Sequence, residues 1–240
     1  IVEILMELDN ATSKHYGLAI SVSKVIAWNG SKGAWLGTML IHRPMLFLHY
    51  FDDAIREVQR SLLATHDERN FMAYKASVHA RLCRLPYCPE LRKQTVSSLR
   101  AADVNRLIQV PGTVIRTGQL KMLQLEREYE CVKCKHRFIC MAELEQRHQM
   151  TLPSECTNTV GLKICGGNKF ELVEGSERCH DYQEIKIQEQ VHRLMVGSIP
   201  RSITVLLQDD LIDSCKAGDD ITVVGMLRQR WRPLQRGMRP

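Results

Sequence analysis

Four cysteines have the residue type and spacing of a structural metal site. Cys131 and Cys134 form a Cys-x2-Cys knuckle, and Cys156 and Cys165 follow after 21 intervening residues, separated from each other by eight. Two thiolate pairs at this separation can place four sulfurs tetrahedrally around Zn²⁺, which leaves no position for water. The pattern predicts a structural zinc ribbon with Cys165 as fourth ligand. Because the second pair encloses a long loop, other nearby donors could replace that ligand: His136, Cys140, His148, Cys179 and His180.

Other chemistry for the cysteines fits the sequence less well. A redox Cys-x-x-Cys normally opens a helix after a strand, whereas an extended run is predicted beyond Cys134. A catalytic zinc needs an open coordination position and a general base, and the sequence has no His-Glu-x-x-His pattern. Nine cysteines without a secretory signal argue against a disulfide framework. We expect Cys83, Cys88 and Cys215 to be small buried apolar residues.

A basic run is the second feature with chemical potential. Residues 226–240 contain five arginines and no acidic residue, so this run carries +5 of the formal net charge of +6. Such a run indicates nucleic acid, anionic lipid or an acidic protein as partner, with a solvated tail as the alternative. A strand is predicted over 221–224. If it continues, its period of two places the guanidinium groups of Arg228, Arg230 and Arg232 on one face, as in the rising arm of a hairpin.

Length and composition bound the class of protein. The 240 residues, 44% hydrophobic and 25% charged, indicate a globular chain with one large or two modest domains. The most apolar stretch, 34–51, is interrupted by His42, Arg43 and Pro44, so we expect no transmembrane helix. The start of the chain lacks both a methionine and the basic region of a signal peptide, which suggests a fragment of an intracellular protein.

Residues 1–90 are predicted to form a helical subdomain. Apolar residues spaced 4, 4, 3 and 4 apart define one face of a helix: Phe47, Phe51, Ile55, Val58 and Leu62. Residues 77–84 alternate and predict a strand that ends before a proline. Residues 21–46 show no clear period.

The rest of the chain predicts short strands around the cysteine region, over 107–116, 120–129, 182–188, 203–207 and 221–224. Pro111-Gly112 predicts a bulge that bends the first strand. Asp209-Asp210 are expected to cap a short helical turn, and Gly218 to end it in the left-handed conformation.

These elements predict an α+β, mainly β fold. A five-stranded Greek-key oligonucleotide-binding (OB) barrel over 91–130 and 180–240 would carry the zinc ribbon, 131–179, as an insertion.

Five segments of this sequence resemble the N-terminal half of the minichromosome maintenance (MCM) DNA helicases, in the same order along the chain. They are VPGTVIRTG, the Cys-x2-Cys knuckle, DYQEIKIQEQ, SIPRSITVLLQDDLIDSC and AGDDITVVGMLRQRW. The sequences of the segments DYQEIKIQEQ and GSIPRS are most similar to those of the ninth paralogue group, the branch associated with recombination repair and meiosis. Residues 21–46 and the long second knuckle depart from the family pattern.

The resemblance implies the N-terminal tier of a nuclear, hexameric helicase that acts on single- or double-stranded DNA, as a homo-hexamer or with a related paralogue. ATP and Mg²⁺ would belong to the family's motor, since this sequence has no Gly-x-x-x-x-Gly-Lys-Ser/Thr motif. The arginine run matches the family's channel hairpin, and residues 190–200 match the loop that couples the barrel to the motor. Further phosphate contacts are expected from Arg116, Arg201 and Lys186.

Three classes therefore compete: a DNA-binding, ring-forming tier, a zinc-ribbon scaffold that binds protein, and a stand-alone metalloenzyme. The absence of a general-base motif in the sequence disfavours the third. The scaffold stays open because single-strand binders usually stack bases on aromatic side chains, and few aromatic residues follow residue 107. If DNA binds, we expect phosphate contacts to dominate, with little sequence preference.

Overall fold

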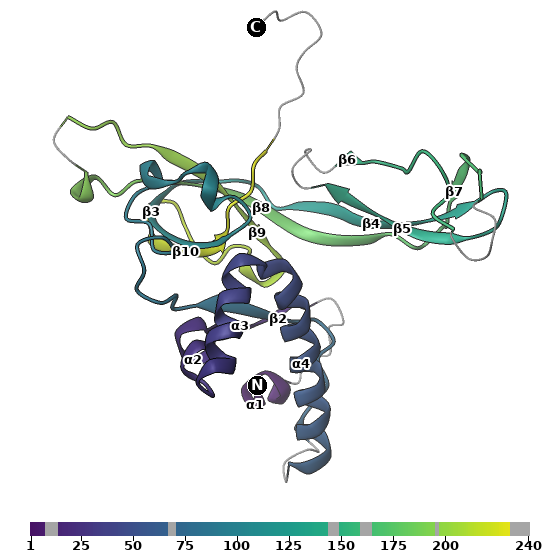
Figure 1. Ribbon diagram of the computed structural model, residues 1–240, viewed down its shortest axis with the longest axis horizontal. Coiled ribbons are helices and arrows are strands. Elements are labelled where there is room, and N and C mark those ends of the chain that lie inside the picture. Colours follow the sequence, from purple (N-terminus) through teal and green to yellow (C-terminus); the bar gives the residue numbers. More distant parts are fainter. Residues whose placement is uncertain (8–13, 67–70, 144–148, 159–164, 195–196, 231–240) are drawn as a thin grey trace, which may run out of the picture. The chain divides into compact units, whose positions relative to one another are not determined.

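The computed structural model describes residues 1–7, 14–66, 71–143, 149–158, 165–194 and 197–230 (Figure 1). The chain divides into two compact units, which are described separately below. The first unit combines Ile1–Gln119 with Gln183–Leu227, and the second combines Leu120–Tyr182 with Arg228–Pro240. In the part of the chain that the structure describes, no helix is long and apolar enough to cross a membrane.

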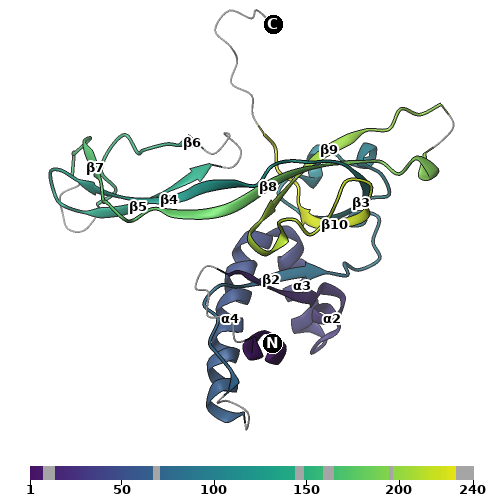
Figure 2. The same cartoon turned by 180° about the vertical axis from the view of Figure 1, so that it is seen from behind.

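The first unit begins with helices packed around a small parallel sheet. Its elements are α1 (Val2–Met6), β1 (Tyr16–Ser21), α2 (Val22–Ala27), α3 (Ser31–His42), α4 (Pro44–Thr65) and β2 (Val78–Cys83). β1 and β2 pair in parallel from Tyr16 opposite Val78 to Ser21 opposite Cys83. Figure 2 shows the two strands side by side. The predicted helix and the predicted strand of this region are thus confirmed as α4 and β2.

The buried face of α4 differs from the prediction at one position. Ile55 is buried against Val78 and Ala80 of β2, as an apolar helical face requires. Val58, by contrast, is 43% exposed. The adjacent Gln59 takes the inward position, because its Oε1 accepts a hydrogen bond of 3.0 Å from the backbone N–H of Lys75. A buried polar residue with a backbone partner interrupts the expected apolar pattern.

Glycines explain why residues 21–46 show no apolar period. A Cβ on Gly33 would collide with the carbonyl oxygen of Trp28, and one on Gly37 would collide with the side chain of Ile26. α2 and α3 therefore pack through bare backbone at these two positions. Close packing of this kind needs small residues rather than a stripe of large apolar ones.

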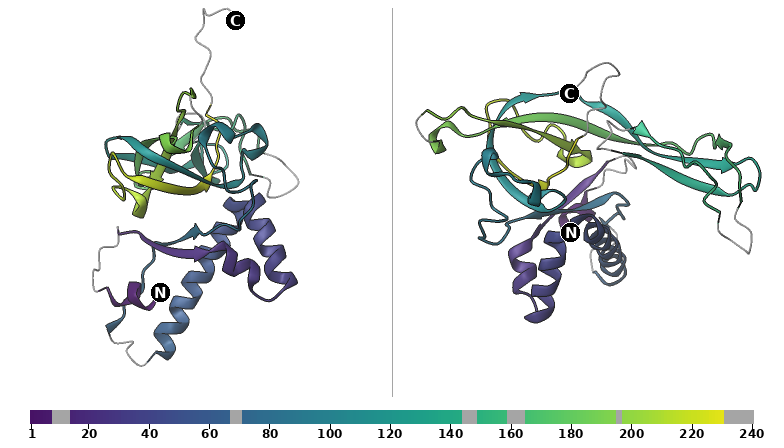
Figure 3. Two further views of the ribbon diagram at one scale, coloured as in Figure 1. Left: turned by 90° about the vertical axis from the view of Figure 1, so that its left-hand side faces the viewer. Right: turned by 45° about the horizontal axis from the view of Figure 1, so that its top comes forward.

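The barrel strands follow in the same unit. The elements after β2 are η2 (Val96–Ser98), η3 (Ala101–Asp103), β3 (Leu107–Thr117), the C-terminal part of β8 (Arg178–Gln188), η5 (Val191–Arg193), β9 (Ser202–Gln208), η6 (Asp209–Leu211) and β10 (Asp220–Met226). β3 pairs with both β10 and β8, and β9 pairs with β8. Figure 3 shows β3, β8 and β10 curving around the barrel. Val114, Ile185, Ile187 and Leu207 form its buried core.

The bulge in β3 lies beyond Pro111-Gly112, so its predicted position is wrong. Pairing with β10 continues without a shift, with Pro111 opposite Thr222. The register shifts instead between Val114 and Arg116, on the side that faces β8. Gly112 serves close packing, since a Cβ there would lie 2.9 Å from the carbonyl oxygen of Gln188.

The acidic pair after β9 also differs from its predicted role. η6 has Gln208 as N-cap residue, and no side chain caps it. Asp210 pairs with Arg81, while Asp209 has a left-handed φ of 56°. Gly218 has a positive φ of 99°, as expected, but lies in the turn before β10 rather than at the end of η6. Asp210 therefore contacts Arg81 and Asp209 lies 3.7 Å from His15, so neither carboxylate caps η6.

The second unit is an antiparallel ribbon. Its strands are β4 (Lys121–Cys131), β5 (Arg137–Glu143), β6 (Gln149–Met150), β7 (Phe170–Leu172) and the N-terminal part of β8. β4 pairs with β5, β7 and β8. Phe138 contacts Tyr129 and Phe170, with ring centroids 6.2 and 5.0 Å away. These rings pack on one another beside the cysteine knuckle. The domain boundaries expected from the sequence, by contrast, stay predictions.

Candidate functional site

The first knuckle of the cysteine cluster is a turn between two strands. Cys131 is the last residue of β4, and its backbone N–H donates to the carbonyl of His136 (2.9 Å). The N–H of Lys135 donates a hydrogen bond to the carbonyl of Cys131 (2.8 Å), and Lys135 has a left-handed φ of 59°. The turn presents Cys131 and Cys134 on the same side.

The second knuckle is held by backbone contacts with the end of the ribbon. The N–H of Cys156 donates to the carbonyl of Gly167 (2.8 Å), and that of Val132 donates to Lys169 (3.1 Å). These bonds place Cys156 and Cys165 opposite the first knuckle. Most of the loop between them, 159–164, lies outside the described residues.

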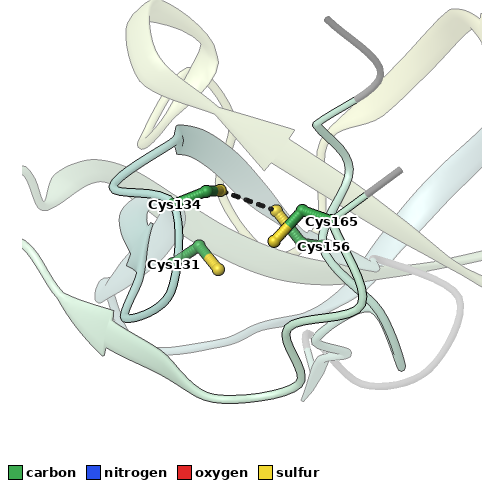
Figure 4. Close-up of side chains that lie close together, drawn as sticks. All are labelled: Cys131, Cys134, Cys156 and Cys165. Carbon is green, nitrogen blue, oxygen red and sulfur yellow. Dashed lines mark hydrogen bonds between the residues drawn. The ribbon is translucent and has the colours of Figure 1, made fainter. Parts of the chain in front are cut away.

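The four sulfurs face a common point (Figure 4). The Sγ atoms of Cys131, Cys134, Cys156 and Cys165 all lie within 4.8 Å of one another, and those of Cys134 and Cys156 are 3.5 Å apart. A Cβ on Gly167 would lie 2.8 Å from the sulfur of Cys131, so only glycine leaves the cluster this compact. Four converging thiols, with no further ligand among the described residues, suit a closed tetrahedral metal site.

Cys165 belongs to this cluster, although the long loop before it left other donors open as the fourth ligand. Among the described residues, His136, Cys140, Cys179 and His180 are not part of it. Cys140 instead directs its thiol to the carbonyl of Thr151 (3.2 Å). His148 lies outside the described residues.

The pKa values of Cys134, Cys156 and Cys165 in the cluster are shifted in different directions. A hydrogen bond from the Asn158 side chain (3.6 Å) helps lower the pKa of Cys134 to about 6. A backbone hydrogen bond from Asn158 favours the thiolate of Cys156, but desolvation and the neighbouring Cys134 and Cys131 raise its pKa to about 12. Desolvation and the same neighbours raise the pKa of Cys165. Thiols with raised pKa values in such a cluster would need a bound cation to ionise fully.

The remaining cysteines are not reactive candidates. Cys88 and Cys215 are partly buried and pack against apolar clusters, and burial raises the pKa of the Cys215 thiol. Cys83 ends β2 and is also partly buried. Their burial is less complete than the sequence prediction, since all three are only partly buried.

Two of the predicted DNA contacts are direct neighbours on the barrel. Arg116 of β3 lies opposite Lys186 of β8 in the antiparallel register, immediately after the bulge. Both side chains are exposed, and neither forms an ion pair with the described residues. Arg201, also exposed, precedes β9. Like charges placed directly opposite each other are destabilising without an anion between them.

The arginine run does not continue β10 as the sequence predicts. β10 ends at Met226, which lies opposite Leu107, the first residue of β3. The strand ends because its pairing partner does. Arg228 and Arg230 are exposed and have no regular secondary structure, while Arg232 and the rest of the run lie outside the described residues.

The loop after β8 has a charged anchor that the sequence analysis missed. Glu189 is 2% exposed, and its carboxylate accepts backbone N–H bonds from Ser97 (2.5 Å) and Arg201 (2.8 Å). Burial alone would raise the pKa of Glu189, but these hydrogen bonds prevail and lower it. The anchor ties both ends of residues 190–200 to the barrel. Near the C-terminal end of the loop, two residues before Arg201, Ile199 is 86% exposed.

Comparison with known proteins places this fold in a family. The profile of the MCM OB domain matches residues 95–230, which include the barrel strands and the cysteine cluster. The chain therefore belongs to the MCM family and contains its OB domain.

Three individual MCM proteins show how similar this chain is to members of the family. "Probable DNA helicase MCM9" of Oryza sativa subsp. japonica is 49% identical over 61% of this chain, and its namesake in Arabidopsis thaliana is 36% identical over 94%. "Minichromosome maintenance protein MCM" of Saccharolobus solfataricus is 30% identical over 92%. The matched segments span only 21%, 35% and 30% of these relatives, respectively.

Proposed function

We propose that this chain is the DNA-gripping and ring-assembling tier of a hexameric MCM helicase of the recombination-repair branch. The plant relatives are both described as DNA helicases, and the matched segment is a minor part of their length. Unwinding and ATP hydrolysis are therefore assigned to a motor outside these residues. The work of this chain is to hold DNA and to organise the ring in the nucleus.

The observation that carries the proposal is the pair formed by Arg116 and Lys186. Two exposed cations occupy opposite positions on paired strands, where they repel each other in the absence of an anion. A nucleic-acid phosphate between them relieves that repulsion and gains two charge-assisted contacts. The bulge next to Arg116 supports the same role, since bulges redirect side chains at binding sites.

Phosphate contacts, rather than base stacking, account best for the described surface of the barrel strands and the ribbon. The described aromatic residues of the ribbon pack on one another, and Tyr182 is only 5% exposed. Binding through phosphates carries little sequence preference. This suits a protein that must move along DNA of any sequence.

Zinc in the four-cysteine cluster would have a structural role. Cys131, Cys134, Cys156 and Cys165 fit Zn²⁺ as tetrahedral thiolate ligands, and the metal would supply folding free energy to the ribbon. The cluster leaves no open position for a substrate. The ribbon would thus present a rigid surface to neighbouring subunits.

Residues 190–200 are the proposed contact with the motor. Their ends are anchored through Glu189, while Val191 and Ile199 are 73% and 86% exposed. Exposed apolar side chains on an anchored loop suit docking against another protein surface. Shortening the loop in the full-length protein should reduce unwinding more than DNA binding.

A zinc-ribbon scaffold without DNA contacts is the second candidate. It is favoured by exposed apolar residues on one strand of the ribbon, Ile139 and Met141, which are 62% and 63% exposed. Such residues are typical of protein-binding surfaces. The two functions can be separated by direct measurement of DNA binding.

The test is fluorescence anisotropy with labelled single- and double-stranded oligonucleotides of mixed sequence. We expect the zinc-loaded chain to bind them, and Arg116→Gln/Lys186→Gln to bind more weakly. Lys32→Gln/Arg43→Gln is the matched control, because it removes two exposed cations from the helical part of the same unit. Equal weakening by both double variants would indicate a response to net charge alone and would contradict the proposed contact.

A further inference from the structure

A second group of metal-binding side chains lies away from the cysteines. His15 directly precedes β1, His79 lies on β2 and Asp209 begins η6. One ligand atom from each lies within 4.8 Å of the others. Their side chains are 24%, 22% and 9% exposed, respectively. These residues come from distant parts of the sequence and meet within one compact unit.

The contacts form a row of four groups. Nδ1 of His15 lies 2.8 Å from Nε2 of His79, with the ring planes inclined by 15°. The outer nitrogens of the two rings face carboxylates: Nε2 of His15 is 3.7 Å from Asp209, and Nδ1 of His79 is 3.5 Å from Asp52. The backbone N–H of Ala80 donates to Asp52 (2.7 Å) and fixes that carboxylate. Each imidazole thus lies between a carboxylate and the other imidazole.

Two neutral imidazoles cannot satisfy all of these contacts. A neutral ring has one N–H and one lone pair. If both N–H groups point to the carboxylates, two lone pairs meet at 2.8 Å; if His15 turns its N–H to His79, its lone pair faces Asp209. Every neutral arrangement leaves two acceptors facing each other. An added cation, either a proton or a metal ion, removes this conflict.

We propose that His15, His79 and Asp209 bind a divalent metal ion of the zinc class. Two imidazoles and a carboxylate are a common donor set for Zn²⁺ with an open position for water. Asp52 would be the outer carboxylate that fixes the tautomer and orientation of His79, an arrangement found behind most metal-bound histidines. A divalent ion also balances the two carboxylates of the row, which a single added proton does not.

The surrounding structure holds these ligands near each other. Arg81, two residues after His79 on the same face of β2, forms a bidentate ion pair with Asp210, next to Asp209. Gly17 of β1 permits this approach, because a Cβ there would collide with the carboxylate of Asp210. β2 and η6 are therefore linked independently of the metal. The ion would add a second link between the N-terminal sheet and the barrel.

The test is calorimetric titration of the 240-residue chain with ZnCl2 after removal of bound metal, so that the cysteine cluster takes up the first equivalent in a first step. We expect a second equivalent to bind and to raise the melting temperature further. His79→Gln should remove the second step and retain the first. His49→Gln is the matched control, since it replaces an exposed histidine of α4 and should retain both steps. Asp52→Asn should weaken the second step by roughly 10–100-fold.

Two results would overturn the proposal. Failure of the parent protein to bind a second equivalent would mean that only a proton occupies the row. A second step that survives in both His79→Gln and His15→Gln would place the metal elsewhere. Circular dichroism and the first zinc step report folding of the variants, and the titration of the parent protein needs no variant. DNA binding is measured separately, so either inference can fail alone.

Discussion

Replacing Glu189 with glutamine tests how the loop of residues 190–200 is anchored. The carboxylate accepts two backbone N–H bonds, from Ser97 at 2.5 Å and from Arg201 at 2.8 Å. Glutamine has nearly the same shape but only one acceptor oxygen, so its amide group must face one of these N–H donors. Glu189→Gln therefore loses one charge-assisted bond and leaves a buried donor unsatisfied.

The expected cost follows from these two losses. Hydrogen bonds to charged groups contribute about 1.5–3 kcal/mol, and a buried unsatisfied group costs a similar amount. With partial relaxation, we expect Glu189→Gln to lower the free energy of unfolding by about 3 kcal/mol at pH 7. For a chain of this size, that corresponds to a fall in melting temperature of roughly 6–12 °C.

The pH dependence of this cost gives a second check. The hydrogen bonds lower the pKa of Glu189 in the folded protein, so its contribution is present above the unfolded value of about 4.3. That contribution is lost as the pH falls through the lower, folded pKa. The difference between the parent and Glu189→Gln should therefore be largest near neutral pH and should shrink in acid.

Scanning calorimetry of the zinc-loaded proteins at pH 7 and in a series of increasingly acid buffers measures both effects. Glu57→Gln is the control, because Glu57 is a surface residue whose side chain is 74% exposed and pairs only with Arg60 among the described residues. Its replacement should cost less than about 1 kcal/mol. A cost below 1 kcal/mol for Glu189→Gln at pH 7, or one that stays constant in acid, would refute the reasoning.

Three further predictions concern the metal site, the core and the arginine run. Gly167→Ala should weaken zinc retention in competition with a chelator, because its Cβ would lie 2.8 Å from the Cys131 sulfur; unchanged retention would contradict the packing of the cluster. Lys93→Met should cost about 3–5 kcal/mol in urea unfolding, since it leaves the buried carboxylate of Asp103, 2.8 Å away, without its cationic partner; a neutral effect would show that the ion pair is dispensable. The triple replacement Arg228→Ala/Arg230→Ala/Arg232→Ala should flatten the logarithmic salt dependence of single-strand binding by about two. An unchanged slope would mean that the arginine run is a solvated tail.

Local patterns predicted the regular elements well, because periodicity reports directly on burial. The spacing around Ile55 predicted α4, and the alternation from Val78 predicted β2. The same reasoning failed where a polar group has a specific partner. Gln59 takes an inward position that an apolar pattern assigns to Val58, and only the distant backbone of Lys75 explains it.

Glycine and proline were harder to interpret from the sequence. Pro111-Gly112 has the composition of a bulge, yet the ladder with β10 passes through it without a shift, and Gly112 instead permits the close approach of β8. Gly33 and Gly37 permit a close helix pair that leaves no apolar period. In each case, the neighbour that requires the glycine is known only once the chain is folded.

The candidate sites also differ in whether their residues lie close together in the sequence. The cysteine cluster was predictable because the ligands come in two short-range pairs. The histidine cluster and the Glu189 anchor were not, since their members lie between 12 and 194 residues apart and share no local spacing. The pairing of Arg116 with Lys186 depends on the strand register, which a bulge shifts by an amount that the sequence does not show.

The most direct test of DNA gripping by this chain is the salt dependence of its binding to a single-stranded oligonucleotide. The measurement compares the parent with Arg116→Gln/Lys186→Gln, both folded and zinc-loaded, in a series of salt concentrations. Each phosphate contact contributes about 0.7 to the logarithmic slope, so loss of two contacts should flatten it by about 1.4. An unchanged slope with unchanged affinity would contradict the account and favour a protein-binding scaffold.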